Sequence, residues 1–239
     1  MSALTGRSAL VTGASRGIGL AVADALEADG ALVVRVARGV ESRAGETALL
    51  RGGVDRRIEL RCDVTREDEV RRLADTVRET VGAPDILVNN AGAFVLKPLA
   101  ETSAEEFRRQ LEVNLAGAFL VLRALVPAMA ERGGHVVTIG SIADHAAYPG
   151  NAGYAASKFG LRGLHETVKA EYAGRGLRFT LVSPGPTDTP LWDAVDPDRH
   201  GDLPDRARML HPSDVADAVR FVVTRPPRAN VELLRLMPA

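Results

Sequence analysis

Short apolar runs rich in β-branched residues alternate with longer amphipathic stretches along the chain, and this alternation limits the fold more than any other feature. A parallel sheet between layers of helices produces this order, because each parallel connection needs a crossover helix. We expect strands at 9–12, 32–37, 58–61, 86–89, 135–139, 179–183 and 232–237, and helices at 17–28, 67–81, 105–130, 154–173 and 213–223. The pattern predicts an α/β fold: a doubly wound, seven-stranded parallel sheet with helices on both faces.

The chain shows neither an internal repeat nor a low-complexity linker, and its 239 residues suit one large core. We therefore assign residues 1–239 to a single domain. The least regular segment is 184–210, which contains five prolines. It follows a predicted strand, where loops overhang the ligand cleft, so we expect a substrate lid there. An ordinary surface connection is the alternative.

Charge and cysteine content narrow the choice of partners and compartment. Thirty basic residues against 31 acidic ones leave a formal net charge of −1, which gives no general attraction to nucleic acid or to a membrane surface. Cys62 is the only cysteine, so an intramolecular disulfide is impossible and a reducing compartment is expected. We find no leader-like segment at the N-terminus and no apolar stretch near the roughly 20 residues that span a bilayer. The expectation is a soluble, cytoplasmic protein with neither a nucleic-acid nor a membrane partner.

A glycine-rich segment joins the first predicted strand to the first predicted helix. Gly13, Gly17 and Gly19 give it the spacing G-x-x-x-G-x-G, which departs from the commoner G-x-G-x-x-G. Glycines let the backbone turn tightly and approach a pyrophosphate, and the free N–H groups at a helix N-terminus attract anions. The segment therefore predicts a dinucleotide site; glycine-rich turns that serve only packing are the alternative.

The end of the second predicted strand indicates which nicotinamide cofactor is used. An acidic residue there would bind the adenosine ribose and repel a 2′-phosphate, but this chain has Ala37 followed by Arg38. Arg38 and Arg16 of the glycine segment could clamp the phosphate with bidentate, charge-assisted hydrogen bonds. We therefore expect NADP(H) as cofactor. The alternative is that Arg38 is solvated and Glu41 binds the ribose. The five histidines have no metal-ligand spacing, so we expect no metal.

Tyr154 and Lys158 are four residues apart on a predicted helix, so their side chains share one face. A tyrosine hydroxyl has a pKa near 10, and a cation within about 4–6 Å lowers that pKa by one to three units. Lys158 suits this role. By itself such a pair usually means only a surface or half-buried contact.

Several motifs occur with this pair in one order along the chain. They are the three glycines at 13, 17 and 19, Asn89-Asn90-Ala91-Gly92, Asn114, Ser141, Tyr154-x-x-x-Lys158 and Pro184-Gly185. The combination strongly resembles the compact, single-domain branch of the short-chain dehydrogenase/reductase family, from about Ala3 to the C-terminus. The resemblance implies a Rossmann-type fold and hydride transfer between the nicotinamide and a carbonyl or alcohol carbon.

The resemblance also implies a four-residue active site. Tyr154 would give its proton to the carbonyl oxygen, and Ser141 would hold that oxygen by a hydrogen bond. Lys158 would bind the nicotinamide ribose and depress the tyrosine pKa. Asn114 would hold a water that links Lys158 to solvent. This is general acid catalysis beside a cofactor that carries the hydride. Ser141 as a turn residue and Asn114 as a helix-kink residue are the structural alternatives.

The cofactor-binding residues that we expect lie at predicted strand ends or on the helices beside them. They are Gly13, Ser15, Arg16, Gly17, Ile18, Gly19, Arg38, Asp63, Val64, Asn90, Ala91, Gly92, Tyr154, Lys158, Pro184, Gly185, Thr187 and Thr189. The resemblance places Asp63 and Val64 at the adenine and Asn90 to Gly92 beside the adenosine ribose. It places the residues from Pro184 to Thr189 along the nicotinamide.

The substrate pocket is the least defined part of the expected site. Its candidate residues are Ser141, His145, Tyr148, Tyr154, Gly185, Leu191 and Trp192. Leu191 and Trp192 favour some apolar bulk, unless they only seal the lid. The Met-Pro pair near the C-terminus resembles relatives that act on short hydroxy acids and similar polar alcohols.

The resemblance implies an NADP-dependent ketoreductase or dehydrogenase that forms a homo-oligomer, a tetramer or a dimer. Apolar positions on the predicted helices 105–130 and 154–173 exceed what one sheet face needs, which agrees with such assembly. Two other functions remain open at this point. A non-catalytic NADP-sensing regulator could use the same fold, and a nucleotide-sugar epimerase also uses Tyr-x-x-x-Lys but usually has a much larger C-terminal region.

Overall fold

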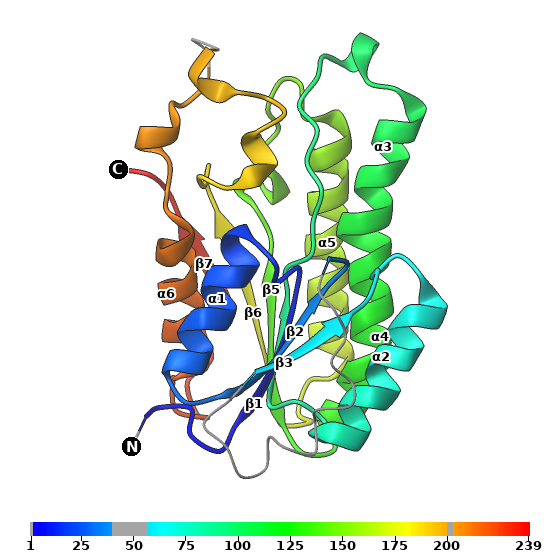
Figure 1. Ribbon diagram of the computed structural model, residues 1–239, viewed down its shortest axis with the longest axis vertical. Coiled ribbons are helices and arrows are strands. Elements are labelled where there is room, and N and C mark those ends of the chain that lie inside the picture. Colours follow the sequence, from blue (N-terminus) through cyan, green and yellow to red (C-terminus); the bar gives the residue numbers. More distant parts are fainter. Residues whose placement is uncertain (1, 40–56, 200–202) are drawn as a thin grey trace.

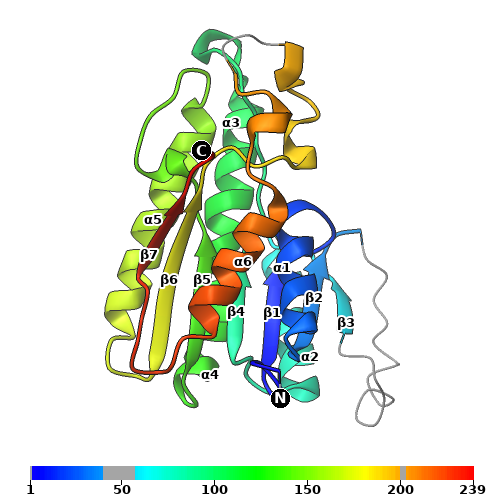
Figure 2. The ribbon, with the colours of Figure 1, turned by 90° about the vertical axis from the view of Figure 1, so that its left-hand side faces the viewer.

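The computed structural model describes residues 2–39, 57–199 and 203–239. Its centre is a seven-stranded sheet in the order β3-β2-β1-β4-β5-β6-β7, with every neighbouring pair parallel. The strands are β1 (Ser8–Thr12), β2 (Leu32–Ala37), β3 (Arg57–Arg61), β4 (Ile86–Asn89), β5 (Gly134–Ile139), β6 (Leu177–Pro184) and β7 (Leu233–Leu236). The strand order reverses between β1 and β4, and ligands of such sheets bind at the carboxyl ends of the strands at this point. Figure 2 shows the sheet with the strands side by side.

Helices cover both faces of the sheet, as the sequence predicted. They are α1 (Gly17–Ala28), α2 (Glu67–Thr80), α3 (Ala104–Leu111), α4 (Gly117–Ala130), α5 (Ala152–Glu171) and α6 (Pro212–Val223). Helices α1 and α6 lie on one face, and α2, α4 and α5 lie on the other (Figure 1). Successive residues of β1 alternate between these layers: Ala9 and Val11 pack with α1 and α6, whereas Leu10 packs with α2 and α4. Burial on both faces explains why the strands read as continuous apolar runs.

The predicted helix 105–130 is interrupted in the structure. Residues Ala104–Leu111 form α3, Glu112–Ala116 form a π-helical turn, and Gly117–Ala130 form α4. Ser103 and Glu106 make a capping box that starts α3. The wide turn contains Asn114, whose side chain bonds outside its own helix, so tertiary contacts rather than local propensity determine this break.

The stretch Ala104–Ala130 also corrects an expectation about apolar length. An 18-residue window within it has a mean hydropathy of 1.8, so it is long and apolar enough by composition to cross a membrane. Half of that window is buried inside the protein, and Val121, Leu125 and Met129 pack on the sheet. A core helix passes the same test, and these contacts place the stretch against the sheet.

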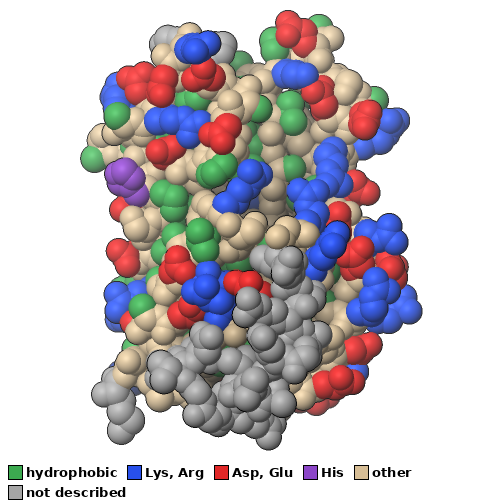
Figure 3. Space-filling model, in the orientation of Figure 1, with side chains coloured by type: hydrophobic (Ala, Val, Ile, Leu, Met, Phe, Trp, Pro, Cys, Tyr) green, Lys and Arg blue, Asp and Glu red, His purple; other side chains and the backbone are tan. Residues whose placement is uncertain are grey.

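The described part of the segment 184–210, residues 184–199 and 203–210, folds over the carboxyl end of the sheet in short turns (Figure 1). Three 3₁₀ turns are described in it, at Pro190–Trp192, Pro197–Arg199 and Arg206–Arg208. Arg206 holds two parts of the segment together, because its guanidinium donates to Asp188 and Asp193, each at 2.7 Å. Over the face in Figure 3, basic and acidic side chains are interspersed, as expected from the balanced composition.

Candidate functional site

The glycine-rich turn needs its three glycines for two different reasons. Gly13 and Gly17 have φ angles of +67° and +56°, a region that side chains rarely adopt. A Cβ atom on Gly13 would also lie 2.9 Å from the Ala91 Cα, and one on Gly19 would overlap the carbonyl oxygen of Gly13. The turn leads into α1, whose N-terminus receives no hydrogen bond from a capping side chain. Its backbone N–H groups are therefore left to bind an anion such as a pyrophosphate.

A hydrogen-bond network joins this turn to the end of β4. The hydroxyl of Thr12 accepts from the backbone N–H groups of Asn90 and Ala91, at 2.9 and 3.0 Å. The side-chain amide of Asn90 donates to the carbonyl oxygens of Thr12 and Gly13, at 2.8 and 3.4 Å. These bonds hold the two strand ends together where the strand order reverses. The sequence reading did not assign Thr12 to the site.

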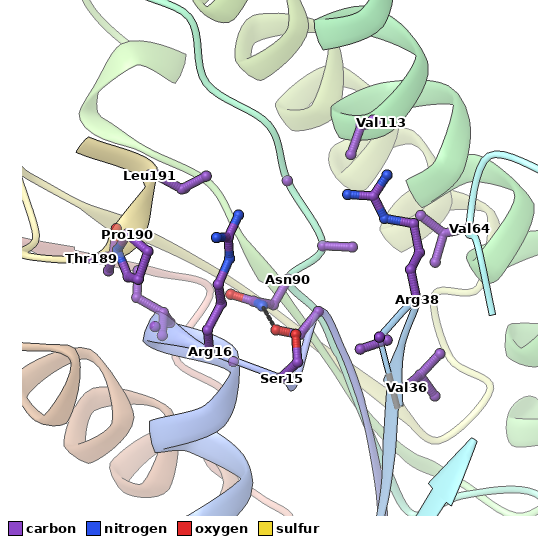
Figure 4. A pocket seen from close by; sticks show the side chains of 18 of the residues that line it. Ser15, Arg16, Val36, Arg38, Val64, Asn90, Val113, Thr189, Pro190 and Leu191 are labelled. Carbon is purple, nitrogen blue, oxygen red and sulfur yellow. Dashed lines mark hydrogen bonds between the residues drawn. The ribbon is translucent and has the colours of Figure 1, made fainter. Parts of the chain in front are cut away.

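A cavity of about 440 Å³ opens between the glycine turn and the ends of β2, β3 and β4. Thirteen of the predicted cofactor residues line it: Gly13, Ser15, Arg16, Gly17, Ile18, Gly19, Arg38, Asp63, Val64, Asn90, Ala91, Gly92 and Thr189. Arg16 extends from the turn and Arg38 from the end of β2, on two sides of the cavity (Figure 4). Arg109 of α3 is a third guanidinium at this cavity and was not predicted. The alternative ribose ligand, Glu41, lies outside the described residues.

Asp63 and Cys62 form the β3 side of this cavity. Burial acts to raise the pKa of Asp63, but hydrogen bonds from the Thr65 N–H and hydroxyl, with the charges of Arg38 and Arg109, lower it overall. Asp63 is therefore a carboxylate that helps to hold two cations at the cavity. Burial raises the pKa of the Cys62 thiol to about 12, so the thiol is neutral and unreactive.

A second cavity, of about 550 Å³, lies beyond the first towards β5, α5 and the segment 184–210. The two cavities share the lining residues Ile18, Asn90, Gly92, Thr189 and Leu191. The remaining predicted cofactor residues Tyr154, Lys158, Pro184, Gly185 and Thr187 line the second cavity, and so does Ser141. The shared lining shows that one elongated ligand could reach from the glycine turn to the hydroxyls of Ser141 and Tyr154.

Ser141, Tyr154 and Lys158 meet on one side of the second cavity. The Ser141 side chain lies near enough to the Tyr154 phenol to act on its pKa. The Lys158 ammonium lies 5.6 Å from the centre of the Tyr154 ring and donates to the carbonyl oxygen of Ile139 at 3.0 Å. Burial lowers the pKa of Lys158 to about 8. This lysine is thus enclosed by the protein beside the tyrosine, with its N–H groups near a strand end.

The Tyr154 pKa shifts in the direction opposite to the one expected from the sequence. Burial raises the pKa of the phenol, and the hydrogen bond to Ser141 only partly offsets this effect. Lys158 is directed to the Ile139 carbonyl rather than to the phenol oxygen, which explains why it does not reverse the shift. In the protein alone, Tyr154 is therefore a neutral proton donor at pH 7.

Asn114 lines neither cavity, although it lies next to the active-site helix. It is 1% exposed, and its amide donates to the Ala93 carbonyl and to the Ser157 hydroxyl, at 2.9 and 2.8 Å. Its oxygen accepts from the Ala93 N–H at 2.7 Å. Both amide hydrogens are therefore used, and the side chain fastens the loop after β4 to α5. Ser157, which completes this link, was missed in the sequence.

Asp144 is the main polar residue near Ser141 that the sequence reading overlooked. It is 0% exposed and accepts from the Ser141 N–H at 3.1 Å and from the Ser183 hydroxyl at 2.8 Å. Its other oxygen contacts the ring of His145. The sequence shows Asp144 only as a neighbour of Ser141, since Ser183 is distant along the chain.

The predicted substrate residues divide into two groups. Ser141, Tyr148, Tyr154, Gly185, Leu191 and Trp192 line the second cavity. His145 is not among its described lining residues, because its ring turns to Asp144. Phe94 was not predicted, yet it lies between two of these residues, with ring centres 4.9 Å from Tyr154 and 5.0 Å from Trp192. Within the described residues, no group of three or more histidine, cysteine or acidic side chains could hold a metal ion.

Comparisons with known proteins identify the family of the chain. The family model for short chain dehydrogenases matches residues 7–200. The chain is 36% identical to D-threitol dehydrogenase of Mycolicibacterium smegmatis, over 92% of this chain and 87% of that protein. It is also 36% identical to glycine betaine reductase ATRR of Emericella nidulans, over 98% of this chain but only 19% of that much longer protein. A solved alcohol dehydrogenase from Thermococcus sibiricus, complexed with 5-hydroxy-NADP, superposes with a TM-score of 0.81 at 31% identity and covers 96% of this chain and 95% of its own. The chain belongs to the short-chain dehydrogenase family.

Proposed function

We propose that this oxidoreductase uses NADP(H) and transfers hydride between the nicotinamide and a carbonyl or secondary-alcohol carbon, with Tyr154 as general acid and base. The observation that carries the proposal is that Ser141, Tyr154 and Lys158 line one cavity, and that this cavity continues into the glycine turn. An extended dinucleotide suits the joined cavities, and the α1 N-terminus suits its pyrophosphate.

Each polar residue at the second cavity would have its own role in the reaction. The bound cofactor would supply or accept the hydride. The Ser141 hydroxyl would hold the substrate oxygen, and the neutral Tyr154 phenol would give that oxygen its proton. Lys158, buried beside Tyr154, would bind the ribose hydroxyls. Asn114 would hold a water for proton exchange. Because both hydrogens of its side-chain amide already donate to other groups, the water would bind to its main-chain carbonyl or to the free lone pair of its side-chain oxygen.

The preference for NADP(H) rests on charge at the first cavity. Arg16 and Arg38 flank it, Arg109 adds a third cation, and the described end of β2 carries no acidic residue. A 2′-phosphate is a dianion that such guanidinium groups bind well. The relative from Thermococcus sibiricus was solved with an NADP derivative, which supports the same choice here.

The direct test is absorbance-monitored oxidation of NADPH and NADH with a panel of aldehydes and ketones. We expect turnover with NADPH that greatly exceeds turnover with NADH, and loss of that turnover in the Tyr154→Phe variant. A protein that binds NADPH tightly but reduces none of the panel would instead be a non-catalytic sensor.

We also propose that the enzyme is cytoplasmic and forms a homotetramer or a homodimer, with the segment 184–210 as a substrate lid. Phe119 of α4 and Phe159 of α5 are 43% and 46% exposed, so both helices present apolar surface to a partner copy. Leu191, Trp192, Leu203 and Pro204 bring the lid segment to the second cavity.

A further inference from the structure

The part of the second cavity beyond Ser141 and Tyr154 has a mostly apolar wall. Its described residues there include Leu96, Ile142, Pro149 and Leu203, in addition to three aromatic side chains. Phe94 packs edge-to-face against Tyr154 on one side and against Trp192 on the other. This aromatic row extends directly from the proton donor, so it would flank whatever group is attached to the reacting carbon.

Charge is nearly absent from this wall. Among the described residues that line the cavity, Lys158 alone is charged, and it is bonded to the Ile139 carbonyl. Asn90, Tyr148 and Asn151 are the polar side chains besides the reacting pair and the two threonines near Gly185, and the Asn90 amide already donates to the carbonyl oxygens of Thr12 and Gly13. A carboxylate in this cavity would lose its hydration without gaining a cation. The Asn151 side-chain oxygen is buried without a partner and could accept from one hydroxyl, but a polyhydroxylated chain would leave others unpaired against the apolar wall.

We infer that the substrate is a neutral carbonyl compound, or the matching alcohol, whose carbonyl carbon bears an aromatic or similarly bulky apolar group. This inference rests on the proposed function and assigns the substrate class of the same site. It differs from the short hydroxy acids and polar alcohols suggested by the chain end, because the Met-Pro pair of that end is not among the residues that line the cavity.

Trp192 makes a binding test possible without turnover, because it is the only tryptophan of the chain and lies in the cavity wall. We would titrate the protein in excess NADP⁺ with ethyl benzoylformate, with benzoylformate and with erythrulose. All three compounds are ketones. The ester is neutral and aromatic, benzoylformate is anionic and aromatic, and erythrulose is polyhydroxylated. We expect saturable quenching by the ester, with an affinity at least about 10-fold higher than for either other ligand. Equal or weaker binding of the ester, or no quenching by any of the three, overturns the inference.

Kinetics separate this inference from the proposed function. With NADPH we expect kcat/KM for the ester to exceed that for the anion by about 100-fold. Trp192→Ala should lower kcat/KM for the ester about 10-fold. The control is Phe221→Ala, which truncates a 47%-exposed phenylalanine on α6 and should leave kcat/KM for the ester unchanged. Faster reduction of erythrulose or of the anion overturns the substrate class but leaves the oxidoreductase function standing. Ester binding at Trp192 without reduction of any ketone refutes the function alone.

A second inference comes from the carboxylate beneath Ser141. The backbone at Gly140 and Ser141 is fitted around Asp144: a Cβ atom on Gly140 would overlap the Asp144 carboxylate, and Ser141 donates its N–H to it. Ser183 of β6 donates to the same oxygen, so Asp144 ties the Ser141 turn to the neighbouring strand. We propose that Asp144 is a positioning residue that sets where the Ser141 hydroxyl lies.

A double-mutant cycle tests this role through Ser141. Asp144→Ala should lower kcat about 10- to 100-fold, with the NADPH dissociation constant unchanged, because small misplacement of a catalytic group is costly. Asp144→Asn keeps an oxygen for the Ser141 N–H and should restore much of kcat. In the Ser141→Ala background, Asp144→Ala should lower kcat little further.

The matched control is Asp85, which accepts from the N–H and hydroxyl of Ser8 at 2.8 and 3.1 Å and precedes β4, away from the cavities. Asp85→Asn should lower Tm but leave kcat unchanged. Equal losses of kcat from Asp144→Ala with and without the Ser141 hydroxyl would show that Asp144 acts elsewhere. If Asp144→Ala lowered Tm but not kcat, the role of Asp144 would be structural only.

Discussion

At the residue scale, the proposed preference for NADP(H) depends on two arginines. Arg16 and Arg38 flank the first cavity from different elements, so each can reach a phosphate independently of the other (Figure 4). Asp63, which follows β3, acts on only one of these two arginines: hydrogen bonds from Thr65 and the charges of Arg38 and Arg109 lower the pKa of its carboxyl.

We expect the double substitution Arg16→Ala and Arg38→Ala to weaken NADPH binding by several kcal/mol, since each charge-assisted hydrogen bond contributes about 1.5–3 kcal/mol. NADH binding should change far less, because NADH lacks the phosphate. Isothermal titration measures both. Arg71→Ala, which removes an exposed charge on α2, serves as the control for net charge and should leave both affinities unchanged. Equal losses for both cofactors would contradict the phosphate assignment.

At the scale of elements, the alternation of strands with helices and the glycine turn were predictable, because hydrophobic periodicity and φ requirements are local. The break of the predicted helix 105–130 was not. It is held by Asn114, whose partners Ala93 and Ser157 are 21 and 43 residues away in the chain. The roles of Asp144 and Phe94 were missed for the same reason, since Ser183 and Trp192 reach them only in the folded chain.

Two buried histidines, His135 on β5 and His165 on α5, make the stability of the protein depend on pH. Burial, the main cause, lowers the pKa of His135 to about 3 and that of His165 to about 4. Above pH 6.5 both are neutral in the folded and unfolded chains. Below it the unfolded chain binds protons first, so each histidine removes about 1.4 kcal/mol of stability per pH unit until its folded pKa is reached.

Urea unfolding between pH 7 and pH 4 tests this effect. We expect His135→Gln and His165→Gln to reduce the slope of stability against pH, even where they lower stability at pH 7 through lost contacts with Thr180 and Thr138. His211→Gln, at an exposed position, should leave the slope unchanged. An unaltered slope in both buried variants would show that their protonation is not linked to unfolding.

At the scale of the whole molecule, the described chain is a seven-stranded parallel sheet covered by helices, and it shares its fold with solved dehydrogenases. The apolar surface that remains exposed on α4 and α5 is the feature that a single copy leaves unexplained. Burial of such surface favours closed, symmetric assembly.

Sedimentation velocity at micromolar concentration should therefore give a dimer or a tetramer. The double substitution Phe119→Glu and Phe159→Glu should shift it towards monomer, because charges are costly to bury in an interface. Leu99→Glu, at a residue that is 79% exposed outside these helices, is the matched control. A wild-type monomer would contradict the prediction.

The central claim is that Tyr154 gives the proton during NADPH-dependent carbonyl reduction. Burial raises its pKa, so the phenol stays protonated and reduction should remain fast through neutral pH, then fall as the pH rises towards the tyrosine pKa. Tyr154→Phe keeps the ring that packs against Phe94, so Tm and NADPH affinity should be preserved. The measurement is the single-turnover rate of reduction of ethyl benzoylformate, or of the best ketone found in the panel. It is made for wild type and for Tyr154→Phe from neutral pH up towards the tyrosine pKa. We predict a loss of about 10²–10⁴-fold in rate and disappearance of the high-pH decline. A Tyr154→Phe variant that reduces the ketone near the wild-type rate would contradict the account.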